Sequence, residues 1–314
     1  MKFLVTGGAG FIGSNLVEAL LGQGGGVRVL DNFSTGQRKN LNFGDKVEVI
    51  EGDIRDAEMC ARACRDADMV FHLAALGSVP RSVEDPVTTH EVNITGTLNM
   101  LLAARDEPMV KRFIFASSSS VYGDPPGVGE NPKREDMPLM PLSPYAASKV
   151  AGEHYCSVFH KVYGLETVIL RYFNVFGPRQ NADSPYASVI PRFIRFLRED
   201  KSPLIYGDGQ QSRDFCYVEN VVHANILCAQ AEQGAVGACI NVAGGQRFSV
   251  NELLSHLCRI MGKSTVPVHE PPRPGDVRHS RADIGLASRL LGYEPMVGFE
   301  EGLRRAVDWF VSSA

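Results

Sequence analysis

Short runs of apolar residues alternate with longer segments of helical periodicity along the first two thirds of the chain. The apolar runs predict strands at 2–6, 27–31, 47–52, 69–74, 112–117 and 167–173. The helical patterns between them lie at 11–22, 55–65, 90–105 and 144–162. Because strands that are apolar on both faces and separated by helices belong to covered parallel sheets, this pattern predicts an α/β fold with a Rossmann-type doubly wound parallel sheet.

The pattern changes beyond about residue 174, where loops lengthen and prolines and arginines become more frequent. Helical periodicity returns at 187–199, 218–232, 249–261 and 299–312. We therefore predict a smaller C-terminal substrate-binding domain. The predicted division assigns 1–173 and about 214–243 to the Rossmann domain, and 174–213 and 244–314 to the smaller one.

Composition restricts the class of partner and the compartment. The chain has 314 residues and a formal net charge of −4, and its basic residues are scattered. This distribution favours neither nucleic acid nor an anionic membrane surface. No run of about 18 apolar residues occurs, and glycines interrupt the apolar start "MKFLVTGGAG". We therefore expect no membrane span, no signal peptide and a cytoplasmic location.

The cysteines point to free thiols rather than to a structural framework. There are seven of them, an odd number, and no CxxC pair occurs. A chain of this size does not need disulfides to stabilise its core. Cys60 and Cys64 are one helical turn apart, but no paired Cys/His set accompanies them, so we expect no metal site.

The glycine-rich stretch "TGGAGFIG" (6–13) follows the first predicted strand and opens a helix. Gly7 would allow a tight turn, and Gly10 would let the backbone approach a pyrophosphate. Gly13 would let the helix pack closely on the strand. The free N–H groups of the helix N-terminus would bind that pyrophosphate, so the stretch predicts a dinucleotide site.

Acidic residues at the ends of the next two strands strengthen this prediction. Asp31 ends the second predicted strand, 18 residues after Gly13. A carboxylate there accepts hydrogen bonds from ribose hydroxyls and repels a 2′-phosphate, which favours NAD over NADP. Arg38 lies nearby and keeps NADP open. Asp53 and Ile54 end the third strand and are further candidates for contact with the cofactor.

The stretch "SPYAASK" (143–149) predicts the start of a helix, with Ser143 as N-cap and Pro144 as first residue. Tyr145 and Lys149 are then i, i+4 neighbours on one helix face. The ammonium, the helix N-terminus and a nicotinamide ring would each favour the phenolate, which would act as a base near neutral pH. The alternative is that Tyr145 packs in the core and Lys149 is solvated.

Four consecutive serines follow the apolar run "RFIF" in "ASSSSVYGD" (116–124). They are either a polar loop after a strand or a source of one catalytic hydroxyl at the strand's C-terminal end. Because neighbouring residues of a strand point to opposite faces, the four cannot share one role.

Several motifs occur together, in order and at family spacing: "TGGAGFIG", "GDI" (52–54), "LAA" (73–75), "NITGT" (93–97), "SSSSVYG", "YAASK" and "RYFNVFGPRQ" (171–180). The chain thereby resembles the extended short-chain dehydrogenase/reductase family, and more closely its nucleotide-sugar 4-epimerases. The resemblance implies a Rossmann domain with tightly bound NAD and a C-terminal domain that holds a UDP-sugar. It also implies a homodimer built through the helices around 90–105 and 144–162.

The resemblance assigns roles to individual residues. Ser118 would hydrogen-bond the reacting sugar oxygen, Tyr145 would be the base, and Lys149 its electrostatic partner. The cofactor-binding positions are Gly7, Gly10, Phe11, Ile12, Gly13, Asp31, Asn32, Asp53, Ile54, Leu73, Ala74, Ala75, Asn93, Tyr145, Lys149 and Phe173. The substrate-binding positions are Ser118, Ser120, Asn174, Ser188, Val189, Tyr206, Arg213, Arg273, Asp276 and Ser280.

The implied reaction is inversion at C4 through a 4-keto sugar, with no net redox change. In the family, the position of Ser280 helps to set the pocket size near the C2 substituent of the sugar, and a small residue there admits an N-acetyl group. We therefore expect UDP-N-acetylglucosamine and UDP-N-acetylgalactosamine as the leading pair. UDP-glucose and UDP-galactose would be a second pair.

Arg213 suits a pyrophosphate, because a guanidinium can donate two parallel hydrogen bonds to it. The alternative is that Arg213 forms a surface ion pair with Asp214.

Three other functions are alternatives to this epimerase activity. A 4,6-dehydratase of the family carries an Asp–Glu pair where this chain has Ser119 and Ser120. A UDP-glucuronate 4-epimerase needs a cation for the sugar carboxylate, for which Arg81 and Arg179 are candidates. A catalytically silent NAD-binding sensor would be expected to lack Tyr145 or Lys149, and this chain has both.

Overall fold

The computed structural model describes residues 1–124, 131–182, 184, 186–272 and 277–312. Its centre is a seven-stranded sheet in the order β11-β6-β5-β4-β1-β2-β3, in which all neighbouring strands are parallel. The strands are β1 (Lys2–Thr6), β2 (Gly26–Asp31), β3 (Val47–Glu51), β4 (Met69–His72), β5 (Arg112–Ser118), β6 (Glu166–Tyr172) and β11 (Cys239–Val242). The predicted Rossmann-type fold is confirmed, and the edge strand β11 is an addition to the six predicted strands.

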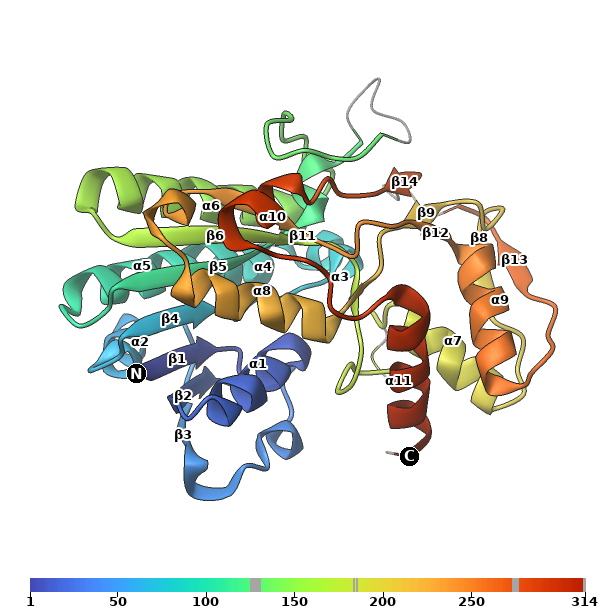
Figure 1. The fold of residues 1–314 in the computed structure, drawn as a ribbon, viewed down its shortest axis with the longest axis horizontal. Helices are drawn as coiled ribbons and strands as arrows, with labels where there is room; N and C mark the ends of the chain where they lie inside the picture. Colours follow the sequence, from blue (N-terminus) through green and yellow to red (C-terminus); the bar gives the residue numbers. More distant parts are fainter. Residues whose placement is uncertain (125–130, 183, 185, 273–276, 313–314) are drawn as a thin grey trace.

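Helices cover both faces of the sheet (Figure 1). The two layers consist of α1 (Phe11–Gly22) with α8 (Val218–Gln230) on one face, and α2 (Ala57–Cys64), α5 (Gly96–Asp106) and α6 (Pro144–Tyr163) on the other. Alternate side chains of one strand enter the two layers. Phe3 and Val5 of β1 pack with α1, whereas Leu4 packs in the opposite core. This alternation explains why the strands are apolar at consecutive positions.

The helix predicted at 90–105 is longer and less regular than its periodicity indicated. It begins with α4 (Pro86–His90), continues through a π-helical turn at Glu91–Thr95 and ends as α5. The earlier start has a local cause, since the Asp85 side chain accepts a hydrogen bond from the Thr88 backbone N–H and a proline follows it. The strand predicted at 69–74 ends at His72, so the "LAA" stretch forms a loop at the sheet edge.

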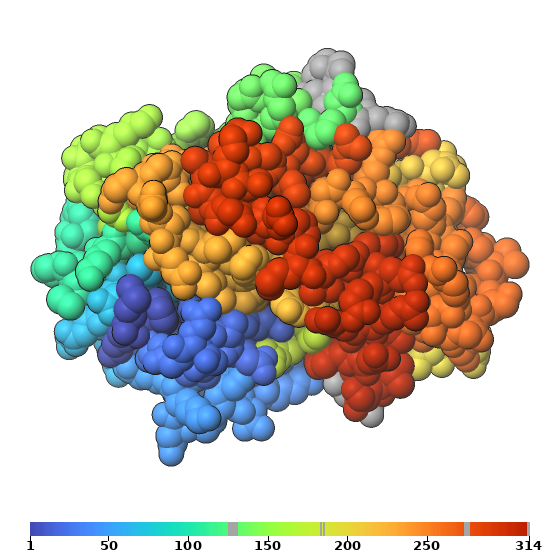
Figure 2. All heavy atoms as spheres, in the orientation of Figure 1, coloured from blue at the N-terminus to red at the C-terminus, as the bar shows by residue number. Residues whose placement is uncertain are grey.

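Most of the C-terminal segments pack beside the ends of the strands, whereas α10 (Gly285–Leu291) packs against β11 and α8 (Figure 1). Their helices are α7 (Val189–Arg198), α9 (Val250–Met261), α10 (Gly285–Leu291) and α11 (Phe299–Ser312). Their short strands are β7 (Val175–Phe176), β8 (Leu204–Tyr206), β9 (Ser212–Arg213), β10 (Cys216–Tyr217), β12 (Phe248–Ser249), β13 (Val268–Glu270) and β14 (His279–Ser280), and α3 (Val79–Glu84) precedes α4. Figure 2 shows the orange and red segments closely packed against the rest of the chain. The predicted domain boundaries stay a prediction.

Two further properties concern the described part of the chain. It contains no helix that is long and apolar enough to cross a membrane. It also contains no group of three or more His, Cys, Asp or Glu residues that could hold a metal ion. All seven cysteines are free thiols.

Candidate active site

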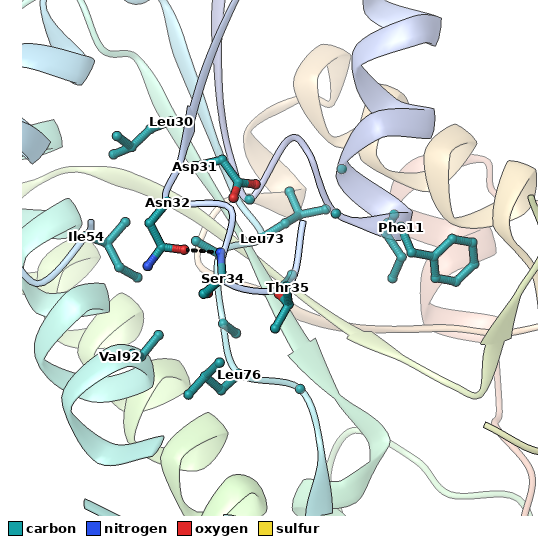
Figure 3. A pocket seen from close by; sticks show the side chains of 18 of the residues that line it. Phe11, Leu30, Asp31, Asn32, Ser34, Thr35, Ile54, Leu73, Leu76 and Val92 are labelled. Carbon is teal, nitrogen blue, oxygen red and sulfur yellow. Dashed lines mark hydrogen bonds between the residues drawn. The ribbon is translucent and has the colours of Figure 1, made fainter. Parts of the chain in front are cut away.

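A cavity of about 320 Å³ lies at the carboxyl ends of the central strands, and we call it the glycine cavity (Figure 3). It is lined by most of the residues predicted to bind the cofactor: Gly7, Gly10, Phe11, Ile12, Gly13, Asp31, Asn32, Asp53, Ile54, Leu73, Ala74, Ala75, Tyr145 and Lys149. Ligands of open α/β sheets bind at this edge, because the loops that follow the strands meet there.

The glycines of this cavity have steric reasons to be glycine. Gly7 has a φ of +69°, and a Cβ atom there would lie 2.8 Å from the backbone N of Ala74. A Cβ atom on Gly13 would lie 2.2 Å from the carbonyl oxygen of Gly7. Gly10 is the N-cap of α1, and no side chain makes a capping hydrogen bond at that end of the helix. The cradle therefore fits a pyrophosphate at the helix N-terminus.

Asp31 is held in place by the backbone around it. Its Oδ2 accepts a hydrogen bond from Ala9 N at 2.9 Å, and its Oδ1 accepts one from Phe33 N at 2.8 Å. Burial raises the pKa of Asp31, while these two hydrogen bonds lower it. Arg38 is paired with Glu51 and stacks over the ring of Phe33 at 4.0 Å. Arg38 is the cation that could bind the 2′-phosphate of NADP. Because it is paired with Glu51, the geometry favours NAD over NADP.

Asn32 and Asp53 form one polar unit at the adenine side of the cavity. Asn32 Nδ2 donates to Asp53 Oδ2 at 2.8 Å. The Oδ1 atom of Asn32 accepts from Ser34 N at 3.0 Å (Figure 3). The Arg55 side chain, followed by its backbone N–H and by Asn32, lowers the pKa of Asp53 to about 2 against the opposing effect of burial. Asp53 is therefore a carboxylate at neutral pH.

Two predicted cofactor residues are not among the described residues that line the cavity. Asn93 is buried, accepts a hydrogen bond from Leu76 N at 2.8 Å and donates to Ser148 Oγ at 3.0 Å. It thereby fixes Leu76, which lines the cavity. Phe173 is fully buried and packs against Tyr122 with a centroid distance of 6.2 Å. The structure places both residues behind the cavity wall.

Several lining residues were missed by the sequence reasoning. They are Leu30, Ser34, Thr35, Gly52, Leu76, Gly77, Val92, Ala116, Ser117 and Tyr172. Most lie at or just beyond a strand end, which is the signal that could have identified them. Their approach to a common cavity depends on the strand order, and the sequence did not determine that order.

Tyr145 also lines a second cavity of about 580 Å³, which we call the serine cavity. The two cavities share Phe11, Ile12, Gly77, Ser117, Tyr145 and Tyr172 in their linings. The phenol therefore lies at the boundary between a dinucleotide site and a second site. This is the position in which a base can serve a substrate that meets the cofactor.

The electrostatics of Tyr145 differ from the sequence-based expectation. Burial raises its pKa, and hydrogen bonding from the Ser118 side chain lowers it. Lys149 donates from Nζ to the carbonyl oxygen of Ala116 at 2.7 Å, and burial lowers its pKa to about 8. The sequence predicts a phenolate from the groups that favour it, whereas the structure shows that burial of the tyrosine opposes the phenolate.

The serines divide between two faces. Ser117 is buried and donates to Glu153 Oε1 at 2.5 Å, so its partner is a side-chain carboxyl group. Glu153 forms a buried ion pair with Arg171 at 2.7 Å. Ser118 ends β5 on the opposite side and lines the serine cavity. Ser120 lies in a 3₁₀ turn, lines the same cavity, and its buried Oγ has no hydrogen-bond partner within the described residues.

The predicted substrate residues occupy two adjoining cavities. Those that line the serine cavity are Ser118, Ser120, Asn174, Ser188, Arg213 and Ser280. An outer cavity of about 830 Å³ is lined by Asn174, Ser188, Val189, Tyr206 and Arg213 among others. Arg273 and Asp276 lie outside the described residues.

Arg213 borders both of these cavities. The carboxylate of its neighbour Asp214 accepts hydrogen bonds from Gly244 N at 2.9 Å and Ala282 N at 3.1 Å. Asp214 is therefore a buried acceptor for the backbone rather than a surface partner. Arg213 donates to the Ser212 carbonyl oxygen at 2.9 Å while its side chain lines the cavities.

The cations considered for a uronate carboxylate lie elsewhere. Arg81 stacks over the ring of Tyr186 at 4.9 Å, and Arg179 pairs with Glu18 at 2.5 Å. Both line a neighbouring cavity, and neither is among the described residues that line the serine cavity. Lys133, which the sequence reasoning missed, is a cation that does line it.

The fold and these cavities are typical of Rossmann-type enzymes that use a dinucleotide. Tyr145 lines both cavities, Lys149 lines the glycine cavity and Ser118 lines the serine cavity. The comparison with known families agrees with this class. The sequence model of the NAD dependent epimerase/dehydratase family matches residues 3–243. The chain belongs to this family.

Individual relatives are similar over nearly the whole chain. The UDP-glucose 4-epimerase of Mycolicibacterium smegmatis is 40% identical over 314 residues, which is 99% of this chain and 98% of the relative. The structure of a UDP-N-acetylglucosamine 4-epimerase from Methanobrevibacter ruminantium, in complex with UDP-N-acetylmuramic acid, is 43% identical with a TM-score of 0.93 and covers 100% of this chain and 99% of that chain. The UDP-glucose 4-epimerase of Thermus thermophilus, in complex with NAD, is 40% identical with a TM-score of 0.91 and covers 100% of both chains.

Proposed function

We propose that this member of the UDP-sugar 4-epimerase family interconverts UDP-N-acetylglucosamine and UDP-N-acetylgalactosamine, with UDP-glucose and UDP-galactose as a second pair. The observation that carries the proposal is Ser280. It is a small, buried residue in the wall of the serine cavity, whose volume is about 580 Å³. A site of this size has space for an acetamido group on the sugar.

In the proposed reaction, Tyr145 removes the proton of the C4 hydroxyl and returns a proton when C4 is reduced on the other face. NAD, when bound, supplies the oxidation and the re-reduction at C4. Ser118 orients the reacting oxygen, and the Lys149 ammonium favours the phenolate. Arg213, between the serine and outer cavities, holds the diphosphate while the keto sugar turns over.

A coupled assay on both UDP-sugar pairs tests the proposal. We expect Ser280→Tyr to lose the acetylated pair and to retain the plain hexose pair, because the ring would fill the space beside the sugar. Ser288→Tyr, at an exposed position on α10, is the matched control. Wild-type protein that fails to turn over the acetylated pair would contradict the proposal.

UDP-glucuronate is a second candidate substrate, because the Lys133 cation lines the serine cavity. The same assay with UDP-glucuronate decides between the two substrates.

A dehydratase has less support. No Asp or Glu is among the described residues that line the serine cavity, and the serines at 119 and 120 carry no group that could act as acid and base for elimination of water.

We also propose a homodimer formed through α4, α5 and α6. The helices α4 and α6 pack against each other and expose Val87, Val158 and Val162, whose exposed fractions are 66%, 47% and 66%. Exposed apolar side chains on adjacent helices are typical of an interface. Light scattering should give twice the mass of the chain, and Val158→Glu should reduce it to the monomer.

A further inference from the structure

The serine cavity contains a buried cation whose role is so far unassigned. Lys133 is only 3% exposed, yet it lines this cavity. Its Nζ donates to the Gly123 carbonyl oxygen at 2.6 Å and lies 5.9 Å from the ring centroid of Tyr122. A buried ammonium needs acceptors, because each uncompensated N–H costs free energy. It has three donors, so Gly123 alone does not satisfy it.

Lys133 is fixed to the wall that carries two predicted substrate residues. It forms a parallel bridge with Ala282, and its N–H donates to the Arg281 carbonyl oxygen at 2.8 Å. The preceding strand β14 pairs with β9, which places Ser280 opposite Arg213. Lys133, Ser280 and Arg213 therefore belong to one continuous wall of the serine cavity.

The cavities separate the tasks of the two cations. Arg213 lines both the serine cavity and the outer cavity, as a diphosphate ligand between sugar and nucleoside would require. Lys133 and Ser280 line the serine cavity and are not in the described lining of the outer one. Lys133 is therefore at the sugar end, together with Ser118 and Tyr145.

The groups around Lys133 leave its ammonium able to donate to a further acceptor. Burial lowers the pKa of Lys133 to about 8, while the charge of Asp124 raises this pKa and that of Arg213 lowers it. Asp124 is exposed and is not among the described lining residues of the serine cavity. Within that lining the side-chain acceptors are neutral hydroxyl and amide groups. A stronger acceptor carried by the substrate would be stabilised there.

We propose, on the basis of the proposed function, that Lys133 determines sugar specificity by donating a hydrogen bond to a C=O oxygen carried by the sugar. An acetamido carbonyl and a uronate carboxylate both provide such an oxygen, and a plain hexose has neither. Ser280 supplies the space for the substituent and Lys133 recognises its oxygen.

The test compares Lys133→Met with wild type on UDP-N-acetylglucosamine, UDP-glucuronate and UDP-glucose. We expect kcat/KM on the acetylated substrate to fall at least about tenfold more than on UDP-glucose, mainly through KM, as for loss of a charged hydrogen bond. A selective loss on UDP-glucuronate would instead identify the carboxylate as the recognised group. Equal losses on all three substrates, or no loss, would overturn the proposal.

Controls separate this result from misfolding and from failure of the proposed function. Lys111→Met removes an exposed lysine outside the cavities and should match wild type. If Lys133→Met does not fold, Lys133→Leu, which also lacks an N–H donor, gives the same ratio test. Wild type that turns over only UDP-glucose ends both proposals. Wild type active on the acetylated pair, with no selective loss in either variant, ends the Lys133 proposal alone.

Discussion

The glycine cavity and the serine cavity are adjacent but are built differently. The glycine cavity is formed mainly by loops that follow the strands of one sheet, from β1 to β5. The serine cavity combines the end of β5 with segments around Lys133, Asn174, Arg213 and Ser280, which lie far apart in the sequence. We infer from this difference that the fold holds its cofactor against the edge of a rigid sheet. The segments that line the serine cavity can vary without disturbing that sheet.

The end of β5 connects the two regions. Ser117 contacts the buried Glu153–Arg171 ion pair, and Ser118 contacts the serine cavity. Arg171 also donates to Tyr122 Oη at 2.8 Å, which ties β6 to the turn after the serines. The predicted catalytic hydroxyl of Ser118 therefore lies next to a network of buried polar contacts, and Ser117 of that network also lines both cavities.

The largest expected effect is at the boundary between the cavities. Tyr145→Phe should lower epimerisation by about 10²–10⁴-fold, because it removes the base, and should leave bound NAD in place. Turnover is measured in a coupled assay, and NAD by its absorbance after release from denatured protein. Tyr163→Phe, at an exposed position on the same helix, is the control. Full activity of Tyr145→Phe would sink the mechanism.

The adjacent serines should separate activity from stability. Ser118→Ala should lose about 10²-fold in kcat. Ser117→Ala should keep most of its activity and lose about 1–3 kcal/mol of unfolding free energy, because the buried Glu153 side chain loses a donor. Denaturant unfolding and the coupled assay measure the two effects. The reverse pattern would mean that the roles of Ser117 and Ser118 are exchanged.

Arg213→Met tests whether the substrate wall can be changed alone. We expect KM for the UDP-sugar to rise about tenfold to hundredfold, since a charged hydrogen bond to the diphosphate is lost. NAD content should be unchanged, because Arg213 is not among the described residues that line the glycine cavity. Arg304→Met, at an exposed position on α11, is the control. Loss of NAD together with affinity would mean that the two regions are coupled.

Asp31→Asn is the converse test in the glycine cavity. It should weaken NAD retention by about tenfold, because a carboxylate that accepts ribose hydroxyls becomes an amide. KM for the sugar nucleotide, measured at saturating NAD, should stay near wild type. Asp45→Asn changes an exposed carboxylate away from the cavity and is the control. Unchanged NAD retention would remove Asp31 from the cofactor site.

The smallest effect concerns pH and Asp214, which is buried against the backbone of Gly244 and Ala282. Burial raises the pKa of Asp214 to about 7, against the lowering effect of backbone hydrogen bonds. Between about pH 4 and pH 7 the folded protein keeps a proton that the unfolded chain releases, so this group lowers stability as pH rises. Asp214→Asn should flatten the Tm profile by about 3–5 °C between pH 5 and pH 7. Parallel profiles would contradict this.

Local patterns were sufficient for much of the fold and for one half of the site. The six predicted strands lie within one or two residues of their positions in the sheet. The helix that begins at Pro144 ends at Tyr163, and Gly164 follows it in a left-handed conformation. The glycine fingerprint and Asp31 line one cavity at the strand ends, where the sequence predicts a dinucleotide site. These features depend on contacts between near neighbours, which the sequence contains directly.

The other features of the site depend on the tertiary structure and could not be predicted from the sequence. No local pattern indicated that Lys133 would be buried in one wall with Ser280, that Ser117 would bond to Glu153, or that burial would raise the pKa of Tyr145. Each depends on segments that meet only after the sheet and the C-terminal segments have packed. Burial and charge pairing are properties of that packing, whereas periodicity and capping are properties of the chain itself.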